Sequence, residues 1–166
     1  MIERFAVIAG LSCVFMVNAA LAGNSTGSPA EGFTIHVVAP HKFEDGTVHG
    51  PYHHYCKPIS DQILQCLLFE STEPNARLTD VEYFVAKPIA RELPLNVWNK
   101  YYHDHAVEIA TGRVQVLDMP EDKAKEIADA AAKTDGIIFH LWPKGQSAPT
   151  GEVGHPQAVG HKPRTE

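Results

Sequence analysis

The chain has 166 residues, of which 44% are hydrophobic and 20% are charged, and these values fit one globular domain with a hydrophobic core of its own. Its formal net charge of −6 opposes contact with nucleic-acid phosphates, so we expect no nucleic-acid partner. The sequence has no glycine-rich phosphate loop, and we expect no nucleotide cofactor.

The first 22 residues have the features of a secretory signal peptide. An apolar run over residues 5–17 follows Arg4, and Ala20 and Ala22 fit the small-residue cleavage rule. The run is shorter than the roughly 20 residues that span a bilayer, and no later segment of the sequence is long and apolar enough. We therefore predict a periplasmic or secreted protein with no transmembrane span after cleavage. An uncleaved N-terminal membrane anchor is the alternative.

Two segments rich in small and turn-forming residues flank the predicted domain. Residues 23–32 are rich in Gly, Ser and Pro and are expected to form a flexible linker. The folded domain is expected over residues 33–142. Proline and glycine recur again through residues 143–166, which predicts a surface-hugging or disordered tail with His155 and His161 in solvent.

Short segments rich in β-branched and aromatic residues, each bounded by turn residues, predict the strands of a mostly antiparallel sheet. In chain order they are residues 33–38, 53–57, 63–70, 81–86, 107–110 with 113–117, and 137–142. The turn residues at 57–61 make residues 53–70 a predicted β-hairpin.

One longer stretch, residues 118–136, has the helical period of 3.6 instead. It places four apolar residues on one face, namely Ala124, Ile127, Ala128 and Ala131. Asp118 and Glu121 predict a capping box, and Gly136 predicts the end of the helix. With a further short helix expected over residues 89–93, we predict an α+β fold: a single domain of short, mostly antiparallel strands with one main helix packed on the sheet.

Histidines in the predicted strands are candidate metal ligands. His103 and His105 lie at positions i and i+2, where strand side chains point the same way and two imidazoles can chelate one ion. The same rule places His54 on one face of its strand with Cys56, and His53 on the other face. His140 lies in an apolar strand, where a buried imidazole needs a hydrogen-bond or metal partner.

Two carboxylates, Glu82 and Glu108, also lie in apolar segments and need partners. We therefore predict a transition-metal site for zinc, copper or iron, with His54, His103, His105 and His140 as ligands and His53 as the alternate to His54. Glu82 or Glu108 is the candidate general base if the protein is an enzyme, a question that stays open. The alternatives are a solvated loop at residues 103–105 and a core His140 satisfied by Glu82 or by a tyrosine such as Tyr83.

Two cysteines, Cys56 and Cys66, remain after signal cleavage removes Cys13. In an export pathway they can form a disulfide, which would stabilise the fold by about 2.8 kcal/mol through loop closure. The alternative is a free thiol at Cys56, activated by His54 as a nucleophile.

Five stretches carry a family resemblance. They are "HHYC" (53–56), "QC" (65–66), "EPNARLTDVEY" (73–83), "HDHAVEIATG" (103–112) and "IIFHLW" (137–142). In this order they resemble the oil-body-associated protein family, which is named from plant seed lipid droplets and whose biochemical function is unknown. The resemblance implies positions but no residue roles. Because this chain opens with an export signal, we expect an exported bacterial relative and do not transfer the lipid-droplet location to it.

The predicted function is therefore an exported small protein with a histidine-rich metal site. One alternative is a non-enzymatic lipid- or envelope-associated binding or structural module. A second is a metal-dependent hydrolase or oxidase of small molecules. The partner is accordingly an unknown small molecule or a component of the cell envelope.

Overall fold

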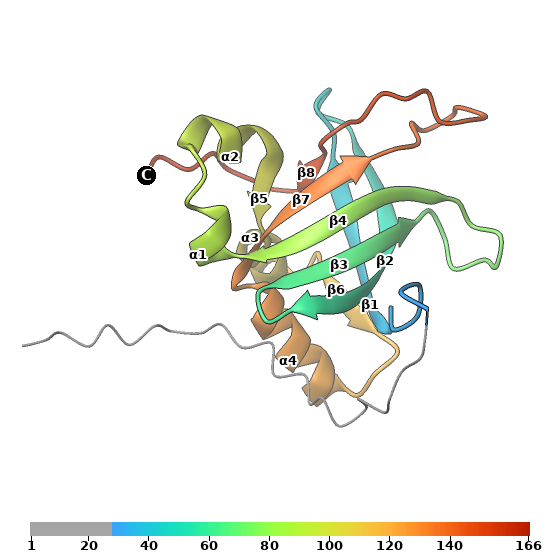
Figure 1. The fold of residues 1–166 in the computed structure, drawn as a ribbon, viewed down its shortest axis with the longest axis horizontal. Coiled ribbons are helices and arrows are strands. Elements are labelled where there is room, and N and C mark those ends of the chain that lie inside the picture. The colour runs from blue at the N-terminus through green and yellow to red at the C-terminus, as the bar shows by residue number, and fades with distance from the viewer. Residues whose placement is uncertain (1–27) are drawn as a thin grey trace, which may run out of the picture.

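A computed structural model gives the fold and describes residues 28–166 (Figure 1). The predicted signal peptide and the first part of the predicted linker lie outside the described residues. Among the described helices, none has the length and apolar character needed to cross a bilayer.

One antiparallel sheet, curled into a half-barrel, organises the part of the chain that the structure describes (Figure 1). Its order is β5-β7-β4-β3-β2-β1-β6, and β8 pairs with β1 beside this path. The strands are β1 (Ile35–Lys42), β2 (Val48–Ser60), β3 (Ile63–Phe69), β4 (Leu78–Ala86), β5 (Tyr102–Asp104), β6 (Gln115–Leu117), β7 (Thr134–His140) and β8 (Gln157–Ala158). The α+β class fits this architecture.

Alternation along the strands decides which side chains face the inside of the curl. In β2 the buried residues Tyr52, His54 and Cys56 alternate with less buried neighbours. Leu64, Cys66 and Leu68 do the same in β3 and pack with them in the hydrophobic core. Because the side-chain period of a strand is two, His54 lies in the same buried row of β2 as Tyr52 and Cys56.

Four helices are present within residues 28–166: α1 (Lys87–Ala90), α2 (Leu95–Tyr101), α3 (His105–Ala110) and α4 (Glu121–Ala131). The expectation of one main helix is therefore not confirmed, although α4 is the longest. Ala131 of α4 is buried in the core, and Ile127 packs against it. The three shorter helices have too few turns to give a clear 3.6-residue pattern in the sequence.

Two local predictions about helices are wrong. Residues 107–110 are part of α3, because the side chain of Asp104 accepts a hydrogen bond from the amide of Ala106 (2.8 Å) and caps this helix. The capping box at Asp118 does not form either. Asp118 has a φ of 61°, and its carboxylate bonds Nδ1 of His36 at 2.6 Å. Helix α4 begins after Pro120 without a side-chain cap.

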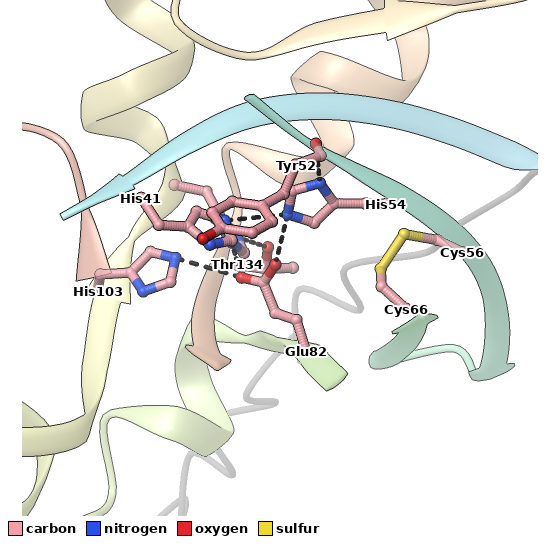
Figure 2. Close-up of a disulfide and its surroundings, with 9 residues drawn as sticks. His41, Tyr52, His54, Cys56, Cys66, Glu82, His103 and Thr134 are labelled. Carbon is pink, nitrogen blue, oxygen red and sulfur yellow. Dashed lines mark hydrogen bonds and ion pairs between the residues drawn. A yellow bond between two sulfur atoms is a disulfide. The ribbon is translucent and has the colours of Figure 1, made fainter. Parts of the chain in front are cut away.

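The predicted hairpin is confirmed, since β2 pairs antiparallel with β3 and sets Cys56 opposite Cys66. These two cysteines form a disulfide across the hairpin (Figure 2). Both are fully buried. The disulfide consumes the thiol that the alternative of a nucleophilic Cys56 requires.

Reduction of this disulfide is expected to lower the free energy of unfolding by about 2.8 kcal/mol, because it releases a cross-link between residues 10 positions apart. Urea unfolding with and without a reductant measures the difference. Alkylation of the native protein without a reductant should add no label at Cys56 or Cys66, whereas alkylation after reduction in urea should label both. Labelling of both residues without a reductant would contradict the assignment.

The C-terminal segment differs from the predicted solvated tail. It returns to the sheet, where β8 pairs Ala158 with His41 of β1. His155 is half-buried, and its Nδ1 donates to the carbonyl of Ile138 at 3.0 Å. His161 is also half-buried and packs against the ring of Trp98, with centroids 5.6 Å apart. Proline and glycine here shape a path along the domain surface.

Candidate functional site

A cluster of four histidines surrounds the carboxylate of Glu82 inside the half-barrel. Glu82 comes from the middle of β4, and the histidines come from four other elements: His41 (β1), His54 (β2), His103 (β5) and His105 (α3). All five side chains are buried, and Glu82 is 2% exposed. Figure 2 shows His54, His103 and Glu82 facing one another beside the Cys56–Cys66 disulfide. We call these five residues the Glu82 cluster.

Each oxygen of Glu82 faces its own histidines. Oε1 lies 3.3 Å from Nε2 of His103 and 3.1 Å from Nε2 of His105. Oε2 lies 3.1 Å from Nε2 of His54, and this nitrogen is also 3.1 Å from Nε2 of His41. The donor atoms therefore form two groups of three, which share Glu82 and whose atoms lie within 4.8 Å of one another.

In His54 and His105, a hydrogen bond of Nδ1 decides whether Nε2, which faces Glu82, carries a hydrogen or a lone pair. Nδ1 of His54 donates to the carbonyl of Tyr52 at 3.0 Å. Nδ1 of His105 contacts Oγ1 of Thr134 at 2.8 Å, and this hydroxyl donates its own hydrogen to the carbonyl of Ala131 at 2.7 Å. His105 must therefore donate to Thr134. In both neutral rings Nε2 is left as an acceptor, directed at a carboxylate oxygen.

Two acceptor atoms 3.1 Å apart need a proton or a metal cation between them. The proton is the solution open to the metal-free protein. Burial alone would lower the pKa of His54, but its hydrogen bond with Glu82 and the charge of that carboxylate raise this pKa. Burial and the same two contributions from Glu82 act on His103, whose pKa is raised as well. The donation of Nδ1 to a fixed acceptor is also what metal-bound histidines in proteins show.

Other groups of the site have pKa values that follow from burial. Burial would raise the pKa of Glu82, but its hydrogen-bond contacts with His103, His105 and His54 hold this pKa well below its usual value. Burial, together with the charge of His54, holds the pKa of His41 well below its usual value. Burial raises the pKa of Glu108, whose Oε2 has no hydrogen-bond partner.

Gly136 of β7 leaves room among the donor atoms. A Cβ at this position would lie 2.5 Å from each of Glu82 Oε1, His103 Nε2 and His105 Nε2. Real Cβ atoms do not approach other heavy atoms this closely. Glycine at residue 136 therefore leaves the space in which these three donor atoms approach one another.

An ion-pair network holds β5 against β7 beside the cluster. Arg91 donates to Asp104 at 2.8 Å and to the buried Asp135 at 2.9 Å, and the indole of Trp98 donates to Asp135 at 2.8 Å. Asp104 separates His103 from His105, and Asp135 precedes Gly136 in the sequence. The network therefore fixes the backbone that carries two of the histidines and the glycine.

Comparison with known proteins gives the family of the chain. Residues 27–161 match the family described as "Protein of unknown function (DUF1264)". The chain belongs to this family. It is 27% identical to Oil body-associated protein 1B of Arabidopsis thaliana over 76% of the chain and 53% of the relative. It is 29% identical to Oil body-associated protein 1A of Zea mays over 60% of the chain and 42% of the relative. It is 32% identical to Oil body-associated protein 2A of Zea mays over 60% of the chain and 40% of the relative.

The DUF1264 chain thus spans about half or less of the length of these curated relatives. No solved structure matches it. The matched range ends at residue 161, so it includes β8 and most of the C-terminal segment that the sequence analysis placed outside the domain.

The DUF1264 structure brings together three of the four predicted ligands, His54, His103 and His105, and the candidate base Glu82. The fourth, His140, lies elsewhere: its Nδ1 is 2.7 Å from Oδ1 of the buried Asp80. His140 is therefore held by a hydrogen bond, as in the alternative, but the partner is Asp80 and not Glu82 or Tyr83.

The two remaining predicted site residues, His53 and Glu108, are not members of the Glu82 cluster. Nδ1 of His53 is 3.0 Å from Nε2 of His36, on the other face of β2. Glu108 is buried in α3, close enough for His103 and His105 to influence its pKa. His41 is the cluster residue that the sequence patterns above do not predict. The signal was the alternation of Val37, Ala39 and His41, which continues past Pro40 into the rest of β1.

Proposed function

We propose that this DUF1264 protein binds a transition-metal ion at the Glu82 cluster. The proposed ligands are Nε2 of His103, Nε2 of His105 and Oε1 of Glu82. The observation that carries the proposal is the convergence of these three buried atoms, which lie within 4.8 Å of one another beside Gly136. Imidazole and carboxylate ligands suit zinc, copper and iron.

The spacing of the donor atoms supports a metal ion. In a tetrahedral site with bonds of about 2.0 to 2.1 Å, neighbouring ligand atoms are about 3.3 Å apart. The distances from Glu82 Oε1 to the nitrogens of His103 and His105 are 3.3 and 3.1 Å. Three protein ligands leave a fourth position for water or another small ligand.

His54 and His41 complete the environment of the other carboxylate oxygen. A protonated His54 donates to Oε2 of Glu82 and thereby orients the carboxylate toward the proposed ion. The nitrogens of His54 and His41 also form the second group of three with Glu82. If elemental analysis gave two ions per chain, the second ion would lie at this group, and Glu82 would contact both ions.

Metal content tests this proposal. Protein purified without chelators and supplied with zinc, copper or iron is expected to hold about one ion per chain by elemental analysis. The combined variant His103→Ala and His105→Ala should lose the ion. The combined variant His49→Ala and His53→Ala removes two histidines outside the cluster and should retain it. Metal-free wild type under saturating metal, or full occupancy in the first variant, would contradict the site.

We also propose that the protein is exported, on the support of the signal-peptide pattern in residues 1–22. The expected result is a mature chain that begins at Gly23 when the protein is expressed in a bacterial host and recovered from the periplasm or medium. Intact-mass measurement and N-terminal sequencing check this. Replacing Ala20 and Ala22 by bulky residues should block cleavage. A full-length chain in the cytoplasm for both forms would refute export.

A further inference from the structure

A pocket of about 390 Å³ lies next to the Glu82 cluster. Its walls come from β2, from the start of β4 and the loop before it, and from the end of β7 and the segment after it. Tyr52 lines this pocket and also stacks on His41, with ring centroids 4.8 Å apart. One ring therefore separates the pocket from the cluster.

His140 is the buried polar side chain of this pocket. It lies in the pocket lining, and its Nδ1 donates to Oδ1 of the fully buried Asp80 at 2.7 Å. The edge-to-face contact with Phe43, at a centroid distance of 4.9 Å, helps to fix the ring. A ring with its one hydrogen on Nδ1, toward Asp80, presents Nε2 as an acceptor, and this buried atom has no hydrogen-bond partner. The hydroxyl of Thr79, also in the lining, is buried without a partner.

The charge of the lining differs in sign from that of the protein. Arg77 and Lys144 contribute two positive charges and Glu70 one negative charge, which leaves +1 with the histidines neutral. The whole chain carries −6. A positive concave site on a negative protein attracts small anions locally. Glu70 already pairs with Arg77, so Lys144 is the cation without a carboxylate partner in this lining.

We propose that this pocket binds a small anion that also carries a hydroxyl group, such as hydrogen phosphate or a hydroxycarboxylate. The anionic oxygens interact with Lys144 and Arg77, and the hydroxyl donates to Nε2 of His140. The hydroxyl of Thr79 supplies a further donor. The requirement for a donor on the ligand follows from the lone pair of His140, because an anion without a hydrogen would place two acceptors against each other. The proposal is independent of the metal ion.

Two tryptophans give a site-resolved readout, since Trp142 lines the pocket and Trp98 does not. The probes are sodium phosphate and glycolate, each titrated into the metal-free full chain at neutral pH while the two indole N–H signals are followed by NMR. The Trp142 signal is expected to shift and saturate in the millimolar range, and the Trp98 signal should stay in place. Saturation by phosphate alone or by glycolate alone identifies the class of ligand.

Sulfate and acetate are the matched controls, because they carry the same types of charge without a hydroxyl. They are expected to bind at least about tenfold more weakly than phosphate and glycolate, which is the loss of one hydrogen bond to a charged ligand. Replacing His140 by glutamine supplies an amide donor and should remove this discrimination.

The variant Lys144→Met should weaken binding about three- to tenfold through loss of one nearby charge. Lys125→Met removes an equal charge from the exposed face of α4 and should change nothing. The proposal is overturned if neither hydroxyl-bearing anion gives a saturable Trp142 shift. It is also overturned if sulfate binds as tightly as phosphate and acetate as tightly as glycolate. Equal affinity of Lys144→Met and Lys125→Met for these anions would overturn it as well.

Discussion

Replacing Gly136 by alanine is expected to abolish metal binding at the Glu82 cluster. The new Cβ would lie 2.5 Å from one oxygen of Glu82 and from Nε2 of both His103 and His105. These three side chains would have to move away from residue 136, and their ligand atoms would no longer converge. We expect the metal affinity to fall by at least about 100-fold, equivalent to about 2.7 kcal/mol. Overpacking should also lower the stability of the metal-free protein by about 1 to 3 kcal/mol.

Isothermal titration with zinc measures the affinity, and circular dichroism shows whether the fold is retained. Gly154→Ala is the matched control, because its Cβ would meet His140 at 3.6 Å, an ordinary van der Waals contact. This control should bind metal like the wild type. If Gly136→Ala bound zinc with unchanged affinity, the ion would have to be placed elsewhere.

Replacing Glu82 by glutamine is expected to lower the free energy of unfolding of the metal-free protein by about 3 kcal/mol or more. The carboxylate is the one counter-charge that the cluster itself supplies to His54 and His103, and both imidazoles are fully buried. Removing one member of a buried charged group leaves the other without compensation. The same variant should lose the metal ion, since a neutral amide is a poorer ligand than a carboxylate.

The cluster also predicts how the stability of the metal-free protein depends on pH. The pKa values of His54 and His103 are raised in the folded state. The stability that these two histidines contribute is therefore complete below about pH 6.5 and is lost as pH rises through their pKa values in the folded protein. Burial lowers the pKa of His41, and it lowers the pKa of His161 to about 4. These two groups lower the stability as pH falls below about 6.5.

The metal-free wild type is therefore expected to be most stable near pH 6.5. Glu82→Gln should show a smaller decline on the alkaline side, because the hydrogen bond and charge of Glu82 are the largest contributions that raise the two pKa values. The decline that remains comes from Glu108, whose pKa burial raises. Urea unfolding between about pH 5 and pH 8 measures both curves. Parallel curves for the wild type and the variant would show that Glu82 does not govern these histidines.

Local sequence patterns predicted those parts of the site that lie within one strand or one short motif. His103 and His105 were found because they are two residues apart, although the structure joins them at the junction of β5 and α3 rather than within a strand. Glu82 was found because an acidic residue in an apolar strand needs a partner. The hairpin followed from turn residues between two apolar segments.

The residues that were missed or misplaced depend on the curl of the sheet, which a local pattern does not encode. His140 and Glu82 are both on buried rows, but the register of β4 with β7 sets His140 opposite Asp80. His41 reaches the cluster because β1 continues past Pro40, a residue that usually ends a central strand. The role of Gly136 follows from the pairing of β7 with β5, which sets it opposite His103.

The pairing of β8 with the end of β1 has a consequence for the colloidal behaviour of the protein. Strand β6 covers β1 at residues 36–38, and β8 covers it at residues 41–42. Together they occupy backbone groups that would otherwise form an open sheet edge, the kind of surface on which copies of a protein assemble edge to edge. A chain cut after Trp142 would uncover the part of that edge beside His41, and such a fragment is expected to precipitate at concentrations where the longer chain stays dispersed.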